Sequence, residues 1–102
     1  MGLGTRWTHT PGDATRADAE RAFRDEGCGV PRSWGNGPGD RYGTHTHDRG
    51  KALFCLEGSI VFHTDDGDVE LTAGDRLDLA AGTAHGATVG SGGCACIEAW
   101  AP

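Results

Sequence analysis

Two histidines separated by one residue are the first feature of this sequence that could do chemistry. His45 and His47 flank Thr46. On a β-strand, residues at positions i and i+2 point to the same face, so both imidazoles can reach one metal ion. Taken alone an H-x-H pair is a weak signal, because strand histidines are often solvated or hydrogen-bonded in place. The pair therefore indicates a metal chelate but leaves a structural role open.

Four cysteines are the other candidate ligands or nucleophiles, and they are Cys28, Cys55, Cys94 and Cys96. The Cys-x-Cys pair at 94 and 96 could ligate zinc, but a structural zinc site needs a second pair at a compatible spacing, which this sequence lacks. We therefore predict free thiols that pack as small apolar side chains. Two further histidines, His9 and His63, are predicted to lie on the surface.

Charge and hydropathy restrict the partners. The 102 residues carry a formal net charge of -6, which is the wrong sign for binding nucleic-acid phosphates or anionic lipid headgroups. No apolar run approaches the roughly 18 to 20 residues of a membrane span, and the N-terminus lacks the apolar core of a secretory signal. We expect a cytoplasmic protein whose partner is a small molecule.

The elements that must position these side chains are mostly strands. Residues 13–26 predict a short helix, with Asp13 as its N-cap and Gly27 as its end. Residues 30–100 form short β-like runs separated by turn residues, and such runs indicate an antiparallel sandwich or small barrel. The predicted strands are 30–34, 42–47, 51–56, 59–63, 69–72, 76–79, 86–89 and 94–100.

The spacing of the glycines and histidines resembles the two sequence motifs of the cupin superfamily. The first motif reads Gly39-x5-His45-x-His47-x3-Lys51-x6-Gly58, and the second reads Gly74-x5-Ala80-x-Gly82-x2-His85 after a gap of 15 residues. The resemblance covers residues 39–89, about half of the chain. It implies an all-β fold, a cupin-type antiparallel β-barrel (a double-stranded β-helix or jelly roll) with a short N-terminal helix. The expected organisation is one domain over 1–102, its barrel over 30–100.

The same resemblance implies one divalent metal ion. In cupins the motif histidines and a motif glutamate bind the metal, so His45, His47 and His85 are the implied ligands. Lys51 stands where cupins have the glutamate, and an ammonium group cannot coordinate a cation. Three imidazoles leave positions open for water, substrate or dioxygen, and they suit iron, zinc, nickel, copper or manganese.

Lys51 itself has two interpretations. If it points into the barrel beside the metal, it could be catalytic, either as a general base or as an anchor for a substrate carboxylate. Alternatively, its stem packs on apolar neighbours and its ammonium reaches solvent at the barrel mouth.

We predict a metal-dependent enzyme, similar to the three-histidine dioxygenases among cupins, that acts on a small organic molecule. The alternative is a non-catalytic cupin that binds or senses a metal or metabolite. A structural metal in a dimerisation unit ranks last, because three ligands leave the ion open. An exposed β edge near residues 30–34 would be a liability in a monomer, and cupins commonly pair edge strands, so we expect a homodimer.

Overall fold

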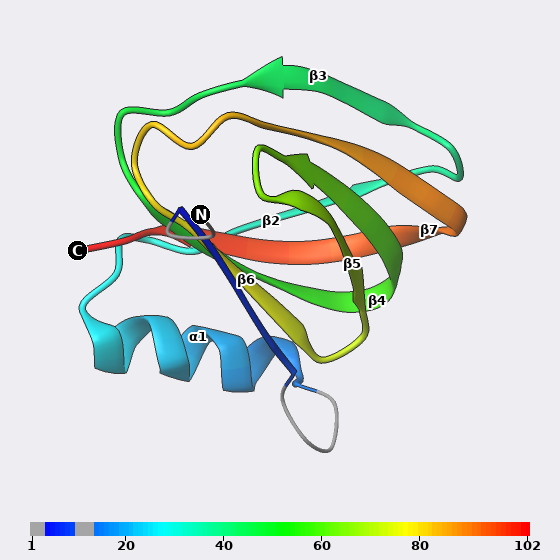
Figure 1. Ribbon diagram of the computed structural model, residues 1–102. Helices are drawn as coiled ribbons and strands as arrows, with labels where there is room; N and C mark the ends of the chain where they lie inside the picture. Colours follow the sequence, from blue (N-terminus) through cyan, green and yellow to red (C-terminus); the bar gives the residue numbers. More distant parts are fainter. Residues whose placement is uncertain (1–3, 10–13) are drawn as a thin grey trace.

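The computed structural model describes residues 4–9 and 14–102 (Figure 1). The elements in chain order are β1 (Thr5–His9), α1 (Arg16–Glu26), β2 (Arg32–Asn36), β3 (Arg41–His45), β4 (Lys51–Thr64), β5 (Gly67–Thr72), β6 (Asp75–Leu79) and β7 (His85–Trp100). Within the described residues, no helix has the length and apolar character needed to cross a membrane.

The strands form one curved antiparallel sheet of seven strands. Its order is β1-β6-β4-β7-β2, with β3 added to β7 and β5 added to β4. The two longest strands, β4 and β7, pair from Lys51 opposite Trp100 to Thr64 opposite His85. These two strands therefore form the frame on which the others are assembled, and the predicted antiparallel β fold with one short helix is confirmed.

Two segments that were predicted to be turns are part of these long strands. Glu57-Gly58 was expected to separate two strands, and 91–93 another two, but β4 and β7 continue through them. The pairing shifts register on either side of Gly58. Gly58 has a φ of 73°, and an added Cβ would overlap the carbonyl oxygen of Gly93. Glycine thus bends the sheet through a bulge without ending either strand. This explains why these residues were wrongly predicted to separate strands.

Strand β1 was not predicted. It pairs with β6 from Thr5 opposite Leu79 to His9 opposite Asp75. Four of its five residues are exposed, so its side chains carry little of the apolar alternation by which strands are found in a sequence.

Helix α1 begins later than predicted. Thr15 is its N-cap, and it forms a capping box in which the Thr15 hydroxyl accepts from the Asp18 amide and the Asp18 carboxylate accepts from the Thr15 amide. The proposed N-cap Asp13 lies outside the described residues. The predicted end is confirmed, because Gly27 takes the left-handed conformation with a φ of 77°, where glycine is favoured.

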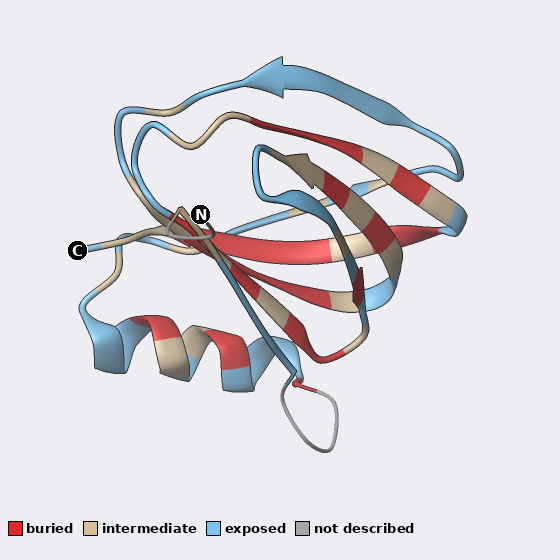
Figure 2. Cartoon of the chain, in the orientation of Figure 1, coloured by how far each residue is buried: buried red, intermediate tan, exposed pale blue. Residues whose placement is uncertain are grey.

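Apolar side chains form two clusters, one on each face of β4. Buried residues lie along β4, β6 and β7 and on α1 (Figure 2). Ala52 and Phe54 point towards α1, where Phe23 meets Phe54 edge-on with ring centroids 5.5 Å apart. Leu53 and Cys55 point into the barrel. The alternation follows from the two-residue period of a strand.

The cysteines behave as predicted. All four are free thiols, and Cys55, Cys94 and Cys96 belong to the apolar cluster inside the barrel. This cluster fills one part of the interior, and the polar residues described next line the rest.

Candidate metal centre

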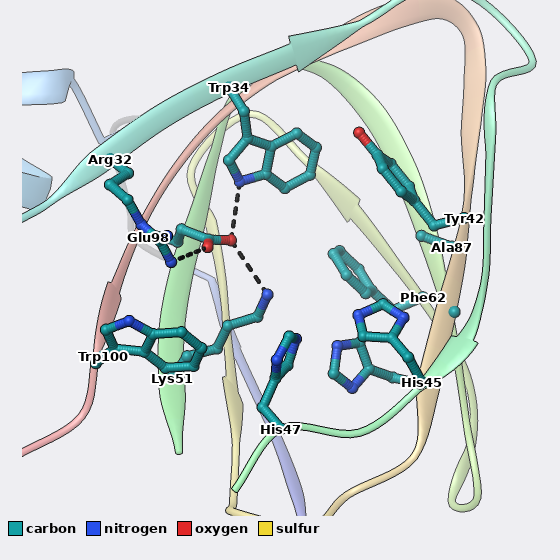
Figure 3. Close-up of a pocket in the computed structure, with 12 residues that line it drawn as sticks. Arg32, Trp34, Tyr42, His45, His47, Lys51, Phe62, Ala87, Glu98 and Trp100 are labelled. Carbon is teal, nitrogen blue, oxygen red and sulfur yellow. Dashed lines mark hydrogen bonds and ion pairs between the residues drawn. The ribbon is translucent and has the colours of Figure 1, made fainter. Parts of the chain in front are cut away.

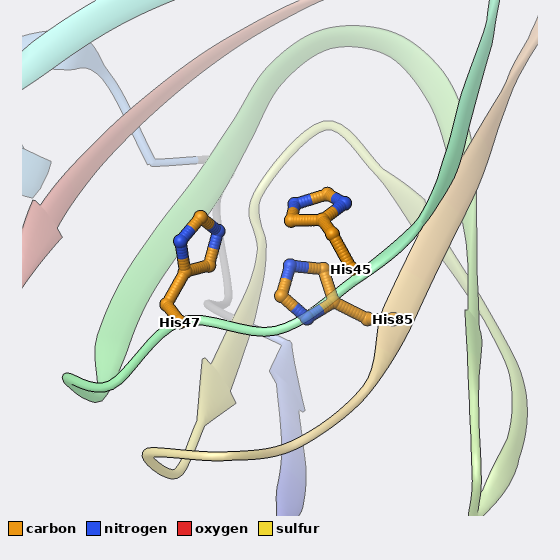
Figure 4. Close-up of side chains that lie close together, drawn as sticks. All are labelled: His45, His47 and His85. Atoms are coloured by element: carbon orange, nitrogen blue, oxygen red, sulfur yellow. The ribbon is translucent and has the colours of Figure 1, made fainter.

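Three histidines from two neighbouring segments meet inside the barrel (Figure 4). His45 ends β3 and His85 begins β7, and the two are direct partners in the antiparallel pairing. His47 lies two residues beyond β3, so the predicted strand 42–47 ends earlier than expected. The candidate ligand atoms all lie within 4.8 Å of one another. At this separation, small rotations of the rings bring all three within reach of one ion with bonds of about 2.1 Å.

Backbone carbonyls set the tautomer of two of these rings. The Nδ1 atom of His45 lies 2.8 Å from the carbonyl oxygen of Gly43, and that of His85 lies 2.9 Å from the carbonyl oxygen of Thr83. Because a carbonyl oxygen can only accept, each Nδ1 carries the hydrogen and each Nε2 keeps a lone pair. This is the outer-shell arrangement by which proteins orient histidine for metal binding.

The Nε2 atoms of the cluster are the candidate metal-binding atoms. Those of His47 and His85 are buried and have no hydrogen-bond partner among the described residues. Buried polar atoms without partners are rare in folded proteins, since each costs about 1–3 kcal/mol. A cation bound by these lone pairs would remove that cost, so the residues fit a metal ion.

Burial and nearby positive charge keep the two inner rings neutral. Burial lowers the pKa of His85 by more than the hydrogen bond to the Thr83 carbonyl raises it, and the charge of Lys51 lowers it further. The same two causes, burial first, lower the pKa of His47. Neutral imidazole is the form that binds a metal, so the rings need not release protons near pH 7.

The histidines line one side of a pocket of about 320 Å³ (Figure 3). This volume lies at the lower end of the range of about 300–1,000 Å³ for small-molecule sites. Its other lining residues are mostly aromatic or charged, and they are Arg32, Trp34, Tyr42, Lys51, Phe62, Gly86, Ala87, Glu98 and Trp100. The pocket can therefore hold a small organic molecule against the histidine cluster.

Lys51 points into this pocket. Its side chain is only 11% exposed, and its Nζ atom lies 3.2 Å from Oε1 of Glu98. Of the two interpretations of Lys51, the one with the ammonium at the barrel mouth is thus wrong. The ion pair with Glu98 holds the Lys51 ammonium inside the pocket.

Glu98 is the site residue that the sequence did not reveal. Its carboxylate is buried, and it accepts hydrogen bonds from three side chains: Trp34 Nε1 at 2.9 Å, Lys51 Nζ at 3.2 Å and Arg32 Nη2 at 3.0 Å. Glu98 shares the inward face of β7 with Cys96, and that parity was its only signal. Its partners come from two other strands, which no local pattern connects.

Trp100 closes the pocket beside His47. The two rings meet edge-on with centroids 5.3 Å apart. The guanidinium groups of Arg32 and Arg49 lie 5.2 and 5.3 Å from the Trp100 ring, distances at which cation–π attraction contributes. This wall of the pocket is therefore rich in positive charge.

The two histidines outside the cluster lie near the surface, as predicted. The side chains of His9 and His63 are 48% and 43% exposed. His9 pairs with Asp75, and His63 pairs with Asp68. Neither ring lines the pocket.

Comparisons with known proteins agree with this architecture. The family model of the cupin domain matches residues 36–100. A crystal structure of an uncharacterized conserved protein with a double-stranded β-helix domain, from Klebsiella pneumoniae subsp. pneumoniae MGH 78578, is 26% identical with a TM-score of 0.63, covering 72% of this chain and 62% of that chain. Among curated proteins, none matches this chain in sequence.

Two further similar structures are of enzymes. One, of DMSP lyases, is 25% identical with a TM-score of 0.61 and covers 71% of this chain and 36% of that chain. The other is the oxalate decarboxylase of Bacillus subtilis, described with Mn(II) centres, which is 16% identical with a TM-score of 0.64 and covers 70% of this chain and 20% of that chain. This chain therefore spans less than two thirds of the length of these three structures.

Proposed function

This chain belongs to the cupin family, and we propose that it is a metal-dependent enzyme that holds one divalent ion through His45, His47 and His85. The observation that carries the proposal is the pair of buried Nε2 atoms on His47 and His85, which have no hydrogen-bond partner in the part of the chain that the structure describes. Together with the Nδ1 contacts of His45 and His85 to backbone carbonyls, it gives a ligand set in which two of the three rings are oriented before any ion arrives.

The donor set favours catalysis over a structural role. Three imidazoles leave coordination positions for a substrate, whereas structural ions are usually enclosed by four protein ligands. When bound, such an ion supplies Lewis-acid polarisation or, if it is iron, dioxygen chemistry of the dioxygenase kind. The ion is proposed to be iron, zinc, nickel, copper or manganese, all of which accept nitrogen ligands.

The surrounding side chains have their own tasks in this proposal. Trp34, Tyr42 and Phe62 give the pocket aromatic walls, which hold the substrate and exclude water from it. Lys51 supplies a positive charge beside the histidines and is the proposed catalytic side chain. The 25% identity to the structure of DMSP lyases supports an enzyme built on this fold.

Metal content and turnover test the proposal together. The protein is purified without a histidine tag, reconstituted anaerobically with each candidate ion, and assayed by inductively coupled plasma mass spectrometry and by oxygen uptake with thiols and β-diketones. We expect one ion per chain in the wild type and in the surface control His63→Ala, and loss of the ion in His45→Ala and His85→Ala. No bound ion under any reconstitution overturns the proposal.

The second candidate is a cupin that binds a metal or metabolite without chemistry. The observation that favours it is Lys51, which occupies the position of the family's glutamate ligand and pairs with Glu98. Ligand-dependent stabilisation of the metal-loaded protein without product formation would select this candidate.

We also propose a homodimer. β2 lies at one end of the strand order, and Val30, two residues before β2, is 84% exposed. All five residues of β3 are also exposed. Open edges of this kind are stabilised by pairing. Light scattering coupled to size exclusion gives the mass, and a single-chain mass at micromolar concentration would contradict the dimer.

A further inference from the structure

We infer that the pocket takes a small monocarboxylate with an apolar body, and that Lys51, positioned by Glu98, binds the carboxylate. This inference rests on the function proposed above and names its substrate class. It is carried by the charges that line the pocket, the free donors of Lys51 and the apolar surface at the opposite end.

The pocket has an excess of positive charge. Its lining residues include two cationic side chains, Arg32 and Lys51, and one carboxylate, Glu98. Arg32 is 56% exposed and its charge is solvated, but Lys51 is only 11% exposed. A bound divalent ion would add two positive charges in the same space. Glu98 balances the charge of Lys51, so the charge of a bound ion would be the part left unpaired. Because unpaired buried positive charge is costly, the pocket with its ion favours a ligand that brings a negative charge.

Lys51 has donors left for such a ligand. An ammonium group has three N–H donors, and Glu98 is its one hydrogen-bond partner in the part of the chain that the structure describes. Figure 3 shows the Lys51 ammonium between the Glu98 carboxylate and the His47 ring. The free N–H groups thus lie on the side of the histidine cluster, where a ligand carboxylate would contact both Lys51 and a bound ion.

Glu98 fixes this orientation. Its Oε1 atom accepts from both Lys51 and Trp34, and its Oε2 atom accepts from Arg32. A carboxylate held by three donors cannot turn away, and so it holds the ammonium inside the pocket. Because its Nζ atom is held beside Glu98 inside the pocket, Lys51 is assigned the role of the carboxylate anchor.

The opposite end of the pocket is apolar. Phe62 and Ala87 form its wall, and Tyr42 presents its ring because its hydroxyl donates to Asn36. Among the described lining residues, this end carries no lysine or arginine that could pair with a second carboxylate. An aryl or branched alkyl monocarboxylate therefore fits better than a dicarboxylate, whose second charge would be buried unpaired.

Benzoate and its uncharged analogue benzamide test the inference. Both are titrated into cobalt-loaded protein, with the visible cobalt spectrum and isothermal calorimetry as readouts and cobalt stoichiometry measured for each variant. In the wild type we expect benzoate to bind about tenfold or more tightly than benzamide, as a charge-assisted hydrogen bond would give. Terephthalate, with its second carboxylate, should bind more weakly than benzoate.

Variants then test whether the preference for benzoate over benzamide depends on Lys51. Lys51→Met should reduce the preference for benzoate over benzamide by about tenfold, the share of one charge-assisted hydrogen bond, while cobalt stays at one per chain; any preference that remains comes from contact of the carboxylate with cobalt. Arg41→Met removes one positive charge from the exposed start of β3 and should leave the preference unchanged. Equal affinity for both probes in the wild type, or an unchanged preference in Lys51→Met, would overturn the inference.

Two substitutions of Glu98 test its positioning role. Glu98→Gln keeps an acceptor oxygen for Lys51 and should keep the preference for benzoate, whereas Glu98→Leu removes the acceptor and should reduce the preference to that of Lys51→Met. A merely structural defect would weaken the binding of benzoate and benzamide equally. The ratio of the two affinities therefore separates a positioning role of Glu98 from a structural one. A Glu98→Leu protein that folds, binds cobalt and keeps the full preference would refute the positioning role.

Failure of the proposed function gives a different result. If the protein binds no cobalt, the metal site is refuted, and the same titrations by calorimetry on metal-free protein decide the inference. Benzoate binding that depends on Lys51 would still support the anchor, and its absence would refute it.

Discussion

His45 and His85 are direct partners across β3 and β7, and their ring centroids lie 4.5 Å apart. Direct cross-strand partners in a sheet are held at a fixed spacing by the backbone hydrogen bonds. The sheet therefore brings the two rings together without help from flexible loops. His47 then joins from the segment between β3 and β4.

Restoring the family's glutamate should strengthen metal binding. Lys51→Glu removes a positive charge beside the histidines and adds a carboxylate at the motif position of the fourth ligand. We expect the dissociation constant for zinc to fall by about tenfold or more, since about 1.4 kcal/mol suffices for that factor. Competition titration with a chromophoric chelator measures it. The control is Lys51→Met, which removes the charge alone, and equal affinities of the two variants would contradict a fourth ligand position.

Gly58 should be irreplaceable in the bulge of β4. Its φ of 73° is strained for other residues, and an added Cβ would overlap the carbonyl of Gly93. We expect Gly58→Ala to lower the free energy of unfolding by at least about 2 kcal/mol, in the range of local backbone strain. Urea denaturation gives the value. Gly92→Ala is the matched control, because a Cβ there meets nothing within 4 Å, and a similar loss in both variants would refute the explanation.

Asp75 should contribute to acid stability. Burial alone would raise its pKa, but hydrogen bonds from the Thr72 backbone and from His9 outweigh burial and lower the pKa below 3.8. Because the folded state favours the ionised form, this stabilisation is present above pH 3.8 and is lost as the pH falls through the lower, folded-state pKa.

The matching variant is Asp75→Asn. We expect it to be less stable than the wild type at pH 7 by about 1–3 kcal/mol, the cost of weakening a buried charged network. The difference should shrink as the pH approaches 2, measured by thermal or urea unfolding across that range. Asp66→Asn, in an exposed turn, should change neither the stability at pH 7 nor its dependence on pH. A pH-independent difference for Asp75→Asn would show that the charge is not the cause.

Turn residues and alternating apolar residues are local signals, and they were sufficient to predict an antiparallel sandwich or small barrel; the motif resemblance then implied the cupin-type barrel. These local signals failed where the same residue types serve another purpose, as at Gly58 and Gly93, which bend strands instead of ending them. They also failed for β1, whose residues are mostly exposed.

The site likewise contains residues that could be predicted from the sequence and residues that could not. His45 and His47 are recognisable from their spacing, and the motif resemblance identified His85 forty residues away. The orientation of Lys51 could not be predicted, because it depends on Glu98. Leu53 on β4 is the backbone partner of Glu98, so the carboxylate reaches Lys51 only through the pairing of β4 with β7. No pattern along the chain encodes that contact.

Nitrogen-15 NMR of the histidine rings during a zinc titration tests the central claim most directly. Before zinc, the rings of His45 and His85 should be the tautomer with hydrogen on Nδ1. One equivalent of zinc should then shift the Nε2 resonances of His45, His47 and His85 together and leave His9 and His63 unchanged. Unshifted cluster resonances, or shifts at His9 or His63 instead, would contradict a three-histidine metal site.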